Sequence, residues 1–190
     1  MMCVKICGIM REEDARLAVE LGASAVGFVF WPGSPRFIDP ERARRIAEPL
    51  IAAGFRCPIN QRFRHEIWVK LLGNVAFNPI SALTRGTLEE LARDRDVSSV
   101  VRMLMAETEA VAAKLNIELP ITIDQRMAGA EKVGAHKTSM LQDFEAGRPL
   151  EIEAIVGAVV ELGDKLGVPM PATKTVYACA KMLDTKARTL

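Results

Sequence analysis

Three polar residues interrupt an otherwise apolar stretch, WVKLLGNVAFNP at residues 68–79. Lys70, Asn74 and Asn78 follow one another at four-residue spacing, which places them on one face of a helix. An ammonium group and two amides are costly to bury without partners. A small ligand with a carboxylate and a carbonyl or hydroxyl would supply them, and lysine can hold a carboxylate or protonate a developing alkoxide. The alternative is a surface lysine with asparagines that satisfy nearby backbone groups.

A second polar cluster lies in HKTSMLQDFEAGRPLEIEA, where Ser139 and Glu151 stand on either side of a predicted helix break at 147–149. Each residue also has a purely structural interpretation. Serine is a frequent N-cap, and an acid in the first turn of a helix is favoured by the helix dipole. Both interpretations stay open from the residues alone.

The elements that would position these side chains are helices. Apolar residues recur at three- and four-residue spacing through most of the chain after residue 50. Thr87 and Glu90 form a capping box, and Asn78-Pro79 should kink or restart its helix, because a residue before proline disfavours helical angles. The predicted helices cover residues 63–77, a short stretch that begins at Thr87, and residues 96–116, 121–133, 139–146, 152–166 and 170–183. Residues 51–190 are therefore expected to form an all-α domain.

Residues 1–50 have a different pattern, strand–helix–strand–helix. MCVKICGI and ASAVGFVF are apolar at nearly every position, which is typical of parallel strands buried on both faces. REEDARLAVELG and PERARRIAEPL are amphipathic helices. This α/β fragment has too few strands to bury its own apolar residues. We therefore expect a homodimer or higher oligomer in which the first 50 residues contribute much of the buried surface.

Composition excludes several classes of protein. With 25 basic and 24 acidic residues the net charge is +1, so no basic field for nucleic acid is expected. The four cysteines form no CxxC pair and there are only two histidines, which disfavours a metal centre. No apolar run is long enough to span a membrane. A cytoplasmic protein with free thiols is the expectation.

The stretches KLLGNVAFNPISALT, KTSMLQD and GRPLEIEAIVG resemble the C-terminal domain of ketopantoate reductase, 2-dehydropantoate 2-reductase, over about residues 53–183. The resemblance implies a helical bundle of the ketopantoate reductase and 6-phosphogluconate dehydrogenase C-terminal type that binds a 2-keto acid. It implies catalytic roles for Lys70 and Glu151. It also implies that Asn74, Asn78 and Ser139 bind the substrate.

The same family uses NADPH, held by a GxGxxG turn in a Rossmann domain, but these 190 residues contain no GxGxxG. We therefore expect no cofactor bound by this chain, NADPH being implied by the family only. The favoured hypothesis is a domain that keeps a keto-acid pocket and is not catalytic alone. The alternative is a 2-dehydropantoate 2-reductase of the pantothenate pathway that is completed by a dinucleotide domain in trans.

A different family is similar to the beginning of the chain. VKICGI and GASAVGFVFWPGSPRFIDPERAR resemble the start of phosphoribosylanthranilate isomerase, an eight-stranded βα barrel, over about residues 2–49. That resemblance implies that Cys7 is a vestigial general base and Arg36 a vestigial substrate-binding residue. The chain thus resembles a fusion of two enzyme fragments. Isomerase activity is the third and least favoured hypothesis, because 48 residues do not close a barrel.

Overall fold

The computed structural model describes residues 4–30, 32–52 and 63–187. Contacts divide the chain into two units, Met1–Gln61 and Arg62–Leu190, where the sequence suggested a boundary near residue 50. Among the cysteines, Cys7 and Cys179 are free and exposed. The other two, Cys3 and Cys57, lie outside the described residues.

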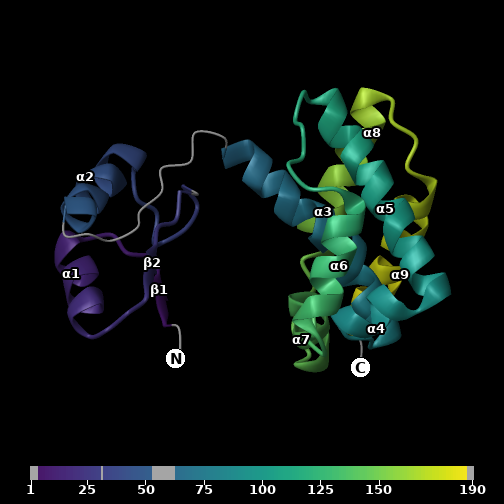
Figure 1. Cartoon of the computed structure of the whole chain (residues 1–190), viewed down its shortest axis with the longest axis horizontal. Coiled ribbons are helices and arrows are strands. Elements are labelled where there is room, and N and C mark those ends of the chain that lie inside the picture. Colours follow the sequence, from purple (N-terminus) through teal and green to yellow (C-terminus); the bar gives the residue numbers. More distant parts are fainter. Residues whose placement is uncertain (1–3, 31, 53–62, 188–190) are drawn as a thin grey trace. The chain divides into compact units, whose positions relative to one another are not determined.

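The first unit contains two short strands and two helices. The strands β1 and β2 are parallel, with Lys5 opposite Ala25 and Cys7 opposite Gly27. Both helices lie on the same side of the strands (Figure 1). In chain order the elements are β1 (Lys5–Cys7), α1 (Glu12–Glu20), β2 (Ala25–Gly27) and α2 (Pro40–Ala52).

The strands are shorter and more exposed than the sequence predicted. All three residues of β1 are exposed, with Ile6 at 42%, and the apolar Val4 just ahead of the strand is 38% exposed. The small core of the unit forms instead between the helices and the loops, around Ile9, Ala15 and Ile46. The prediction that both faces of the strands are buried is therefore wrong for the described residues. Among the described residues, two short strands with helices on one side leave much of the other side uncovered.

The second unit is built of helices around a long central one, α3 (Phe63–Thr84) (Figure 1). Helix α3 packs against α4, α5, α7, α9 and a one-turn π-helix, η1. The remaining elements are α4 (Leu88–Arg93), α5 (Arg95–Lys114), α6 (Ile123–Val133), α7 (Ser139–Glu145), η1 (Glu153–Gly157), α8 (Ala158–Leu166) and α9 (Pro171–Ala187).

Helix α3 continues through Pro79 without interruption, so the prediction that the helix restarts there is wrong. Its apolar residues serve two separate cores. Trp68 and Val75 belong to one, while Leu72 and Phe77 belong to the other. Burial on two sides at once outweighs the local cost of a proline, which removes one backbone hydrogen bond.

Local signals at the helix ends agree better with the sequence. The capping box is present, because the Glu90 N–H donates to Thr87 Oγ1 and the Thr87 N–H donates to the Glu90 carboxylate at 2.8 Å. A longer-range cap was not predicted. Glu107 on α5 accepts the Thr173 N–H at 2.8 Å and thereby caps the first turn of α9.

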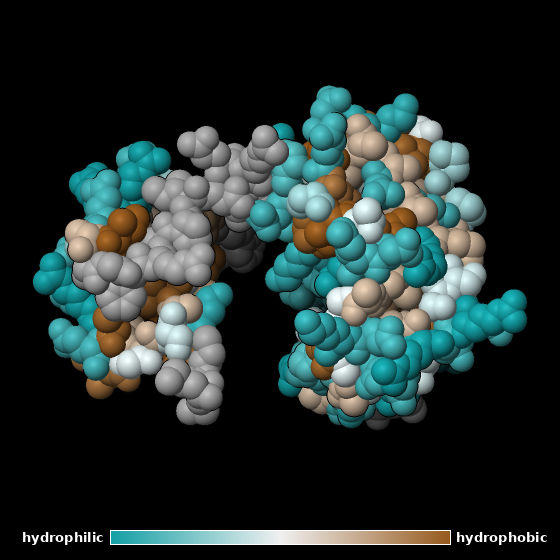
Figure 2. Space-filling model, in the orientation of Figure 1, coloured by the Kyte–Doolittle hydropathy of each residue, from teal (hydrophilic) through white to brown (hydrophobic). Residues whose placement is uncertain are grey.

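The surface of the helical unit in view is mostly polar, with small separated apolar patches (Figure 2). Across the described ranges, none of the helices has both the length and the apolar character that a membrane span requires.

Candidate functional site

The three polar residues of α3 differ in exposure. Lys70 is exposed, Asn74 is half-buried, and Asn78 is only 4% exposed. The Asn78 amide nitrogen, Nδ2, is buried and has no hydrogen-bond partner within the described part of the chain. A buried amide donor without an acceptor costs free energy. Its presence on the same face as Lys70 points to a polar group that is missing from the protein itself.

The stripe of Lys70, Asn74 and Asn78 occupies the one sector of α3 that neither core uses. At 3.6 residues per turn, Leu72 and Phe77 point to one side of this sector and Trp68 and Val75 to the other. The two cores therefore fix the rotation of α3, and the polar stripe lies between them.

Ser139 is the first residue of α7 and is exposed. The helix is capped by the preceding residue, because Thr138 Oγ1 accepts the Leu141 N–H at 3.2 Å. The interpretation of Ser139 as the N-cap is therefore wrong. Its hydroxyl is not used for that cap and is available to a ligand.

Glu151 lies directly ahead of a helical segment that starts at Ile152. Its carbonyl accepts the Ile155 N–H at 3.0 Å, while its side chain is exposed between the buried Leu150 and Ile152. The glutamate therefore stands just outside the first turn and projects from a well-packed backbone.

The segments that carry the five predicted residues meet around α3. Helix α7 and η1 both pack against it. Met140, next to Ser139, and Ile152, next to Glu151, share a single core cluster with Val75 of α3. Helix α7 and η1 thus pack against the helix that carries Lys70, Asn74 and Asn78, about 60 residues earlier in the chain.

The loop between Ser139 and Glu151 is fixed by ionic contacts. Arg148 pairs with Asp143 at 2.6 Å, and its N–H donates to the Asp143 carbonyl at 2.8 Å. The Leu150 N–H donates to Asp184 Oδ1 at 2.9 Å. These contacts order the backbone on which Glu151 stands.

Close to Glu151, the side chains of Glu153, Tyr177 and Lys181 form a cluster. The Tyr177 hydroxyl donates to Glu153, and Lys181 Nζ lies 2.7 Å from the Glu153 carboxylate. Hydrogen bonds from Lys181 and then Tyr177 lower the pKa of Glu153. The hydrogen bond to Glu153 raises the pKa of Tyr177 and that of Lys181. The cluster therefore favours an ionised glutamate with a neutral phenol and a charged lysine.

These pKa shifts predict how stability depends on pH. The lowered pKa of Glu153 adds stability above the ordinary glutamate pKa of about 4.3. That contribution is lost as the pH falls through the lower, folded-state pKa. The raised pKa of Tyr177 and of Lys181 adds stability that is lost as the pH rises above about 10. The measurement is the free energy of unfolding in urea at a series of pH values. Glu153→Gln should reduce the decrease of this free energy at acidic pH. Glu161→Gln, which breaks an exposed pair with Lys165, should reduce that decrease less.

Arg126 is a residue that the sequence analysis missed. Its guanidinium packs on Gly73 of α3, where an added Cβ would lie 2.1 Å from Nη2. Its Nε is buried without a partner among the described residues, and burial lowers the pKa of the group. A glycine inside a buried helix was the available signal, because glycine there usually makes room for something.

In the first unit, Arg36 Nη1 lies 3.3 Å from the Cys7 carbonyl, so the two predicted vestigial residues are close together.

The turn between β1 and α1, around Gly8, does not fit the phosphates of a dinucleotide. The Arg36 side chain fills the space beside Gly8, where an added Cβ would lie 2.7 Å from Arg36 Cδ. The first turn of the following α1 carries three acids, Glu12, Glu13 and Asp14, which would repel phosphate.

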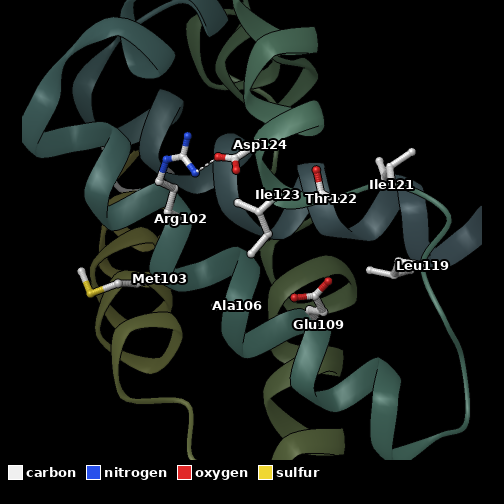
Figure 3. A pocket seen from close by; sticks show the side chains of 9 residues that line it. All are labelled: Arg102, Met103, Ala106, Glu109, Leu119, Ile121, Thr122, Ile123 and Asp124. Carbon is white, nitrogen blue, oxygen red and sulfur yellow. Dashed lines mark hydrogen bonds and ion pairs between the residues drawn. The ribbon is translucent and has the colours of Figure 1, made fainter.

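A groove of about 570 Å³ lies elsewhere on the helical unit, between α5 and the segment that leads into α6 (Figure 3). Its apolar wall includes Met103 and Ile123, and the Arg102–Asp124 ion pair closes one end at 2.5 Å. None of the residues predicted to act in chemistry lines it. In the described part of the chain, no group of three or more potential metal ligands is found.

Comparisons with known proteins agree with the helical unit. Residues 62–184 match the family "ketopantoate reductase PanE/ApbA C terminal". A 2-dehydropantoate 2-reductase of Mesorhizobium japonicum is 43% identical over 171 residues, which are 87% of this chain and 52% of that protein. The crystal structure of 2-dehydropantoate 2-reductase from Methylococcus capsulatus is 35% identical, with a TM-score of 0.68 over 77% of this chain and 47% of that one.

Another enzyme is also similar in sequence. The N-(5'-phosphoribosyl)anthranilate isomerase of Thermotoga maritima is 36% identical over 131 residues, which are 66% of this chain and 62% of that protein.

The chain spans about half the length of the curated reductases that it matches. With the family match covering residues 62–184 and well over half of the chain, this protein belongs to the ketopantoate reductase PanE/ApbA C-terminal family.

Proposed function

We propose that residues 63–187 form the 2-keto acid-binding half of a ketopantoate reductase. The observation that carries the proposal is the buried amide nitrogen of Asn78, which has no hydrogen-bond partner among the described residues and lies on the same helix face as Lys70 and Asn74. The packing of α7, which carries Ser139, and of η1, which begins two residues after Glu151, against the same helix supports the proposal. The relatives that share this domain are named 2-dehydropantoate 2-reductases.

Each residue has a role that its group can perform. The amides of Asn74 and Asn78 donate to the keto and hydroxyl oxygens of the ligand, and the Ser139 hydroxyl donates to its carboxylate. Lys70 places an ammonium at the keto oxygen, where it stabilises negative charge and supplies a proton. Glu151 accepts a hydrogen bond from the ligand and organises Lys70.

NADPH supplies hydride in the named relatives' reaction class, and the residues of this chain do not fit its phosphates at the β1–α1 turn. We therefore propose that this chain binds the keto acid without NADPH and is not catalytic alone. A dinucleotide domain provided by another polypeptide would complete the reductase. Isomerase activity is not proposed, because the described part of the first unit has only two paired strands.

Calorimetric titration with ketopantoate tests the proposal. The chain should bind the keto acid, and Asn78→Leu should weaken binding by about tenfold or more, because it removes a buried donor to the ligand. Asn116→Gly, two residues after the end of α5 and at a φ of 56° that glycine tolerates, is the control and should bind normally. Absence of ketopantoate binding by the unmodified chain would refute the proposed function.

A further inference from the structure

Helix α9 carries a polar stripe that faces the backbone around Glu151. Tyr177, Lys181 and Asp184 follow at spacings of four and three residues and so share one helix face. Asp184 is 8% exposed and accepts the Leu150 N–H at 2.9 Å. A buried carboxylate that accepts a backbone N–H is a strong, charge-assisted contact. It fixes the residue immediately before Glu151.

The other two residues of the stripe fix the chain just after Glu151. Tyr177 donates to Glu153, and Lys181 pairs with the same carboxylate at 2.7 Å while its Nζ lies 5.0 Å from the Tyr177 ring centroid. The space for this contact depends on Gly157, where an added Cβ would lie 2.8 Å from the Tyr177 hydroxyl oxygen. Two residues on α9 therefore hold Glu153 from one side.

The backbone that begins at the second anchor, Glu153, is unusual. Residues Glu153–Gly157 form a π-helix, a widened turn that is rare and is found often at functional sites. Tyr177 and Lys181 contact the first residue of this widened turn, Glu153. Anchors at Leu150 and Glu153 restrict the direction in which the intervening Glu151 side chain leaves the backbone.

We infer that Tyr177, Lys181 and Asp184 are positioning residues that set the Glu151 carboxylate for the bound keto acid. This inference rests on the proposed function, in which Glu151 contacts the ligand. The stripe does not touch the ligand. It acts through the backbone of residues 150–153, so its effect on binding should require Glu151.

The test measures ketopantoate affinity by calorimetry in the full chain. Asp184→Leu removes the acceptor for the Leu150 N–H, whereas Asp184→Asn keeps an oxygen in its place. Asp184→Leu and Tyr177→Phe should each weaken binding about fivefold or more, and Asp184→Asn should remain within about twofold of the original chain. The control is Lys174→Met, also on α9, which breaks the ion pair of Lys174 with Asp164 of α8 and should have no effect on affinity.

A double-mutant cycle separates positioning from general stability. In a Glu151→Ala background, Tyr177→Phe should have no further effect on affinity, because the residue it positions is gone. Equal losses with and without Glu151 would overturn the inference, as would normal binding by both Asp184→Leu and Tyr177→Phe.

Hydrogen exchange provides a second test that needs no ligand. The Ile155 amide, which donates to the Glu151 carbonyl, should exchange faster in Tyr177→Phe and remain unchanged in Lys174→Met. Unchanged exchange in Tyr177→Phe would overturn the inference even if the chain bound no ketopantoate. Loss of binding by the unmodified chain together with faster exchange in Tyr177→Phe would refute the proposed function and leave the anchoring of this segment supported.

Discussion

The purified chain, mixed with ketopantoate and NADPH, is expected to give turnover at least about 10⁴-fold below a typical enzyme rate of about 10 s⁻¹. Hydride transfer requires a cofactor held against the substrate. The 190 residues contain no GxGxxG, and the β1–α1 turn presents an occupied space and three acids to any phosphate. Loss of NADPH absorbance under steady-state conditions is the measurement.

A fusion provides the positive control for this result. Residues 63–187 joined to the half of the Mesorhizobium japonicum relative that this chain does not match should restore turnover. The unfused chain supplied with that part as a separate polypeptide tests completion in trans. Rapid ketopantoate-dependent oxidation of NADPH by the unfused chain alone, abolished by a change at Lys70, would contradict the account.

In the active fusion, Lys70→Met should lower kcat by about 10²–10⁴-fold, the usual contribution of a general acid. Methionine keeps the length of the side chain and removes the ammonium. Lys70→Arg should restore little, because a guanidinium differs in shape and gives up its proton far less readily.

The control for this substitution is another exposed lysine of the same unit. Lys132→Met, on α6, should leave kcat within about twofold, as expected for a surface change. If Lys70→Met and Lys132→Met had the same small effect, Lys70 would have no catalytic role.

The polar stripe could be predicted because it is local. Lys70, Asn74 and Asn78 lie on one helix, so their spacing alone places them on one face. Whether that face is free depends on where the two cores lie, and only the packed structure shows this. The same packing kept α3 intact through Pro79, against the local preference of the residue before proline.

Other features could not be predicted because they depend on contacts between distant residues. Leu150 and Asp184 are 34 residues apart, and Glu153 and Tyr177 are 24 apart. Ser139 was open to a capping role until the structure showed that its neighbour Thr138 accepts the hydrogen bond. Local pattern did not distinguish two adjacent hydroxyl residues.

The assembly of the first unit stays a prediction. Its apolar residues Val4, Ile6 and Phe37 are exposed in the single chain. We still propose that a second copy of the chain covers them, in a homodimer or larger oligomer.

The most direct test of the keto-acid pocket is an NMR spectrum of the chain with ¹⁵N in its asparagine side chains only. The chain has four asparagines, Asn60, Asn74, Asn78 and Asn116, and single substitutions assign their amide signals. Addition of ketopantoate should shift the Asn74 and Asn78 signals and leave that of Asn116, an exposed residue just after α5, unchanged. Saturating ketopantoate that shifts neither Asn74 nor Asn78 would contradict a 2-keto acid site on α3.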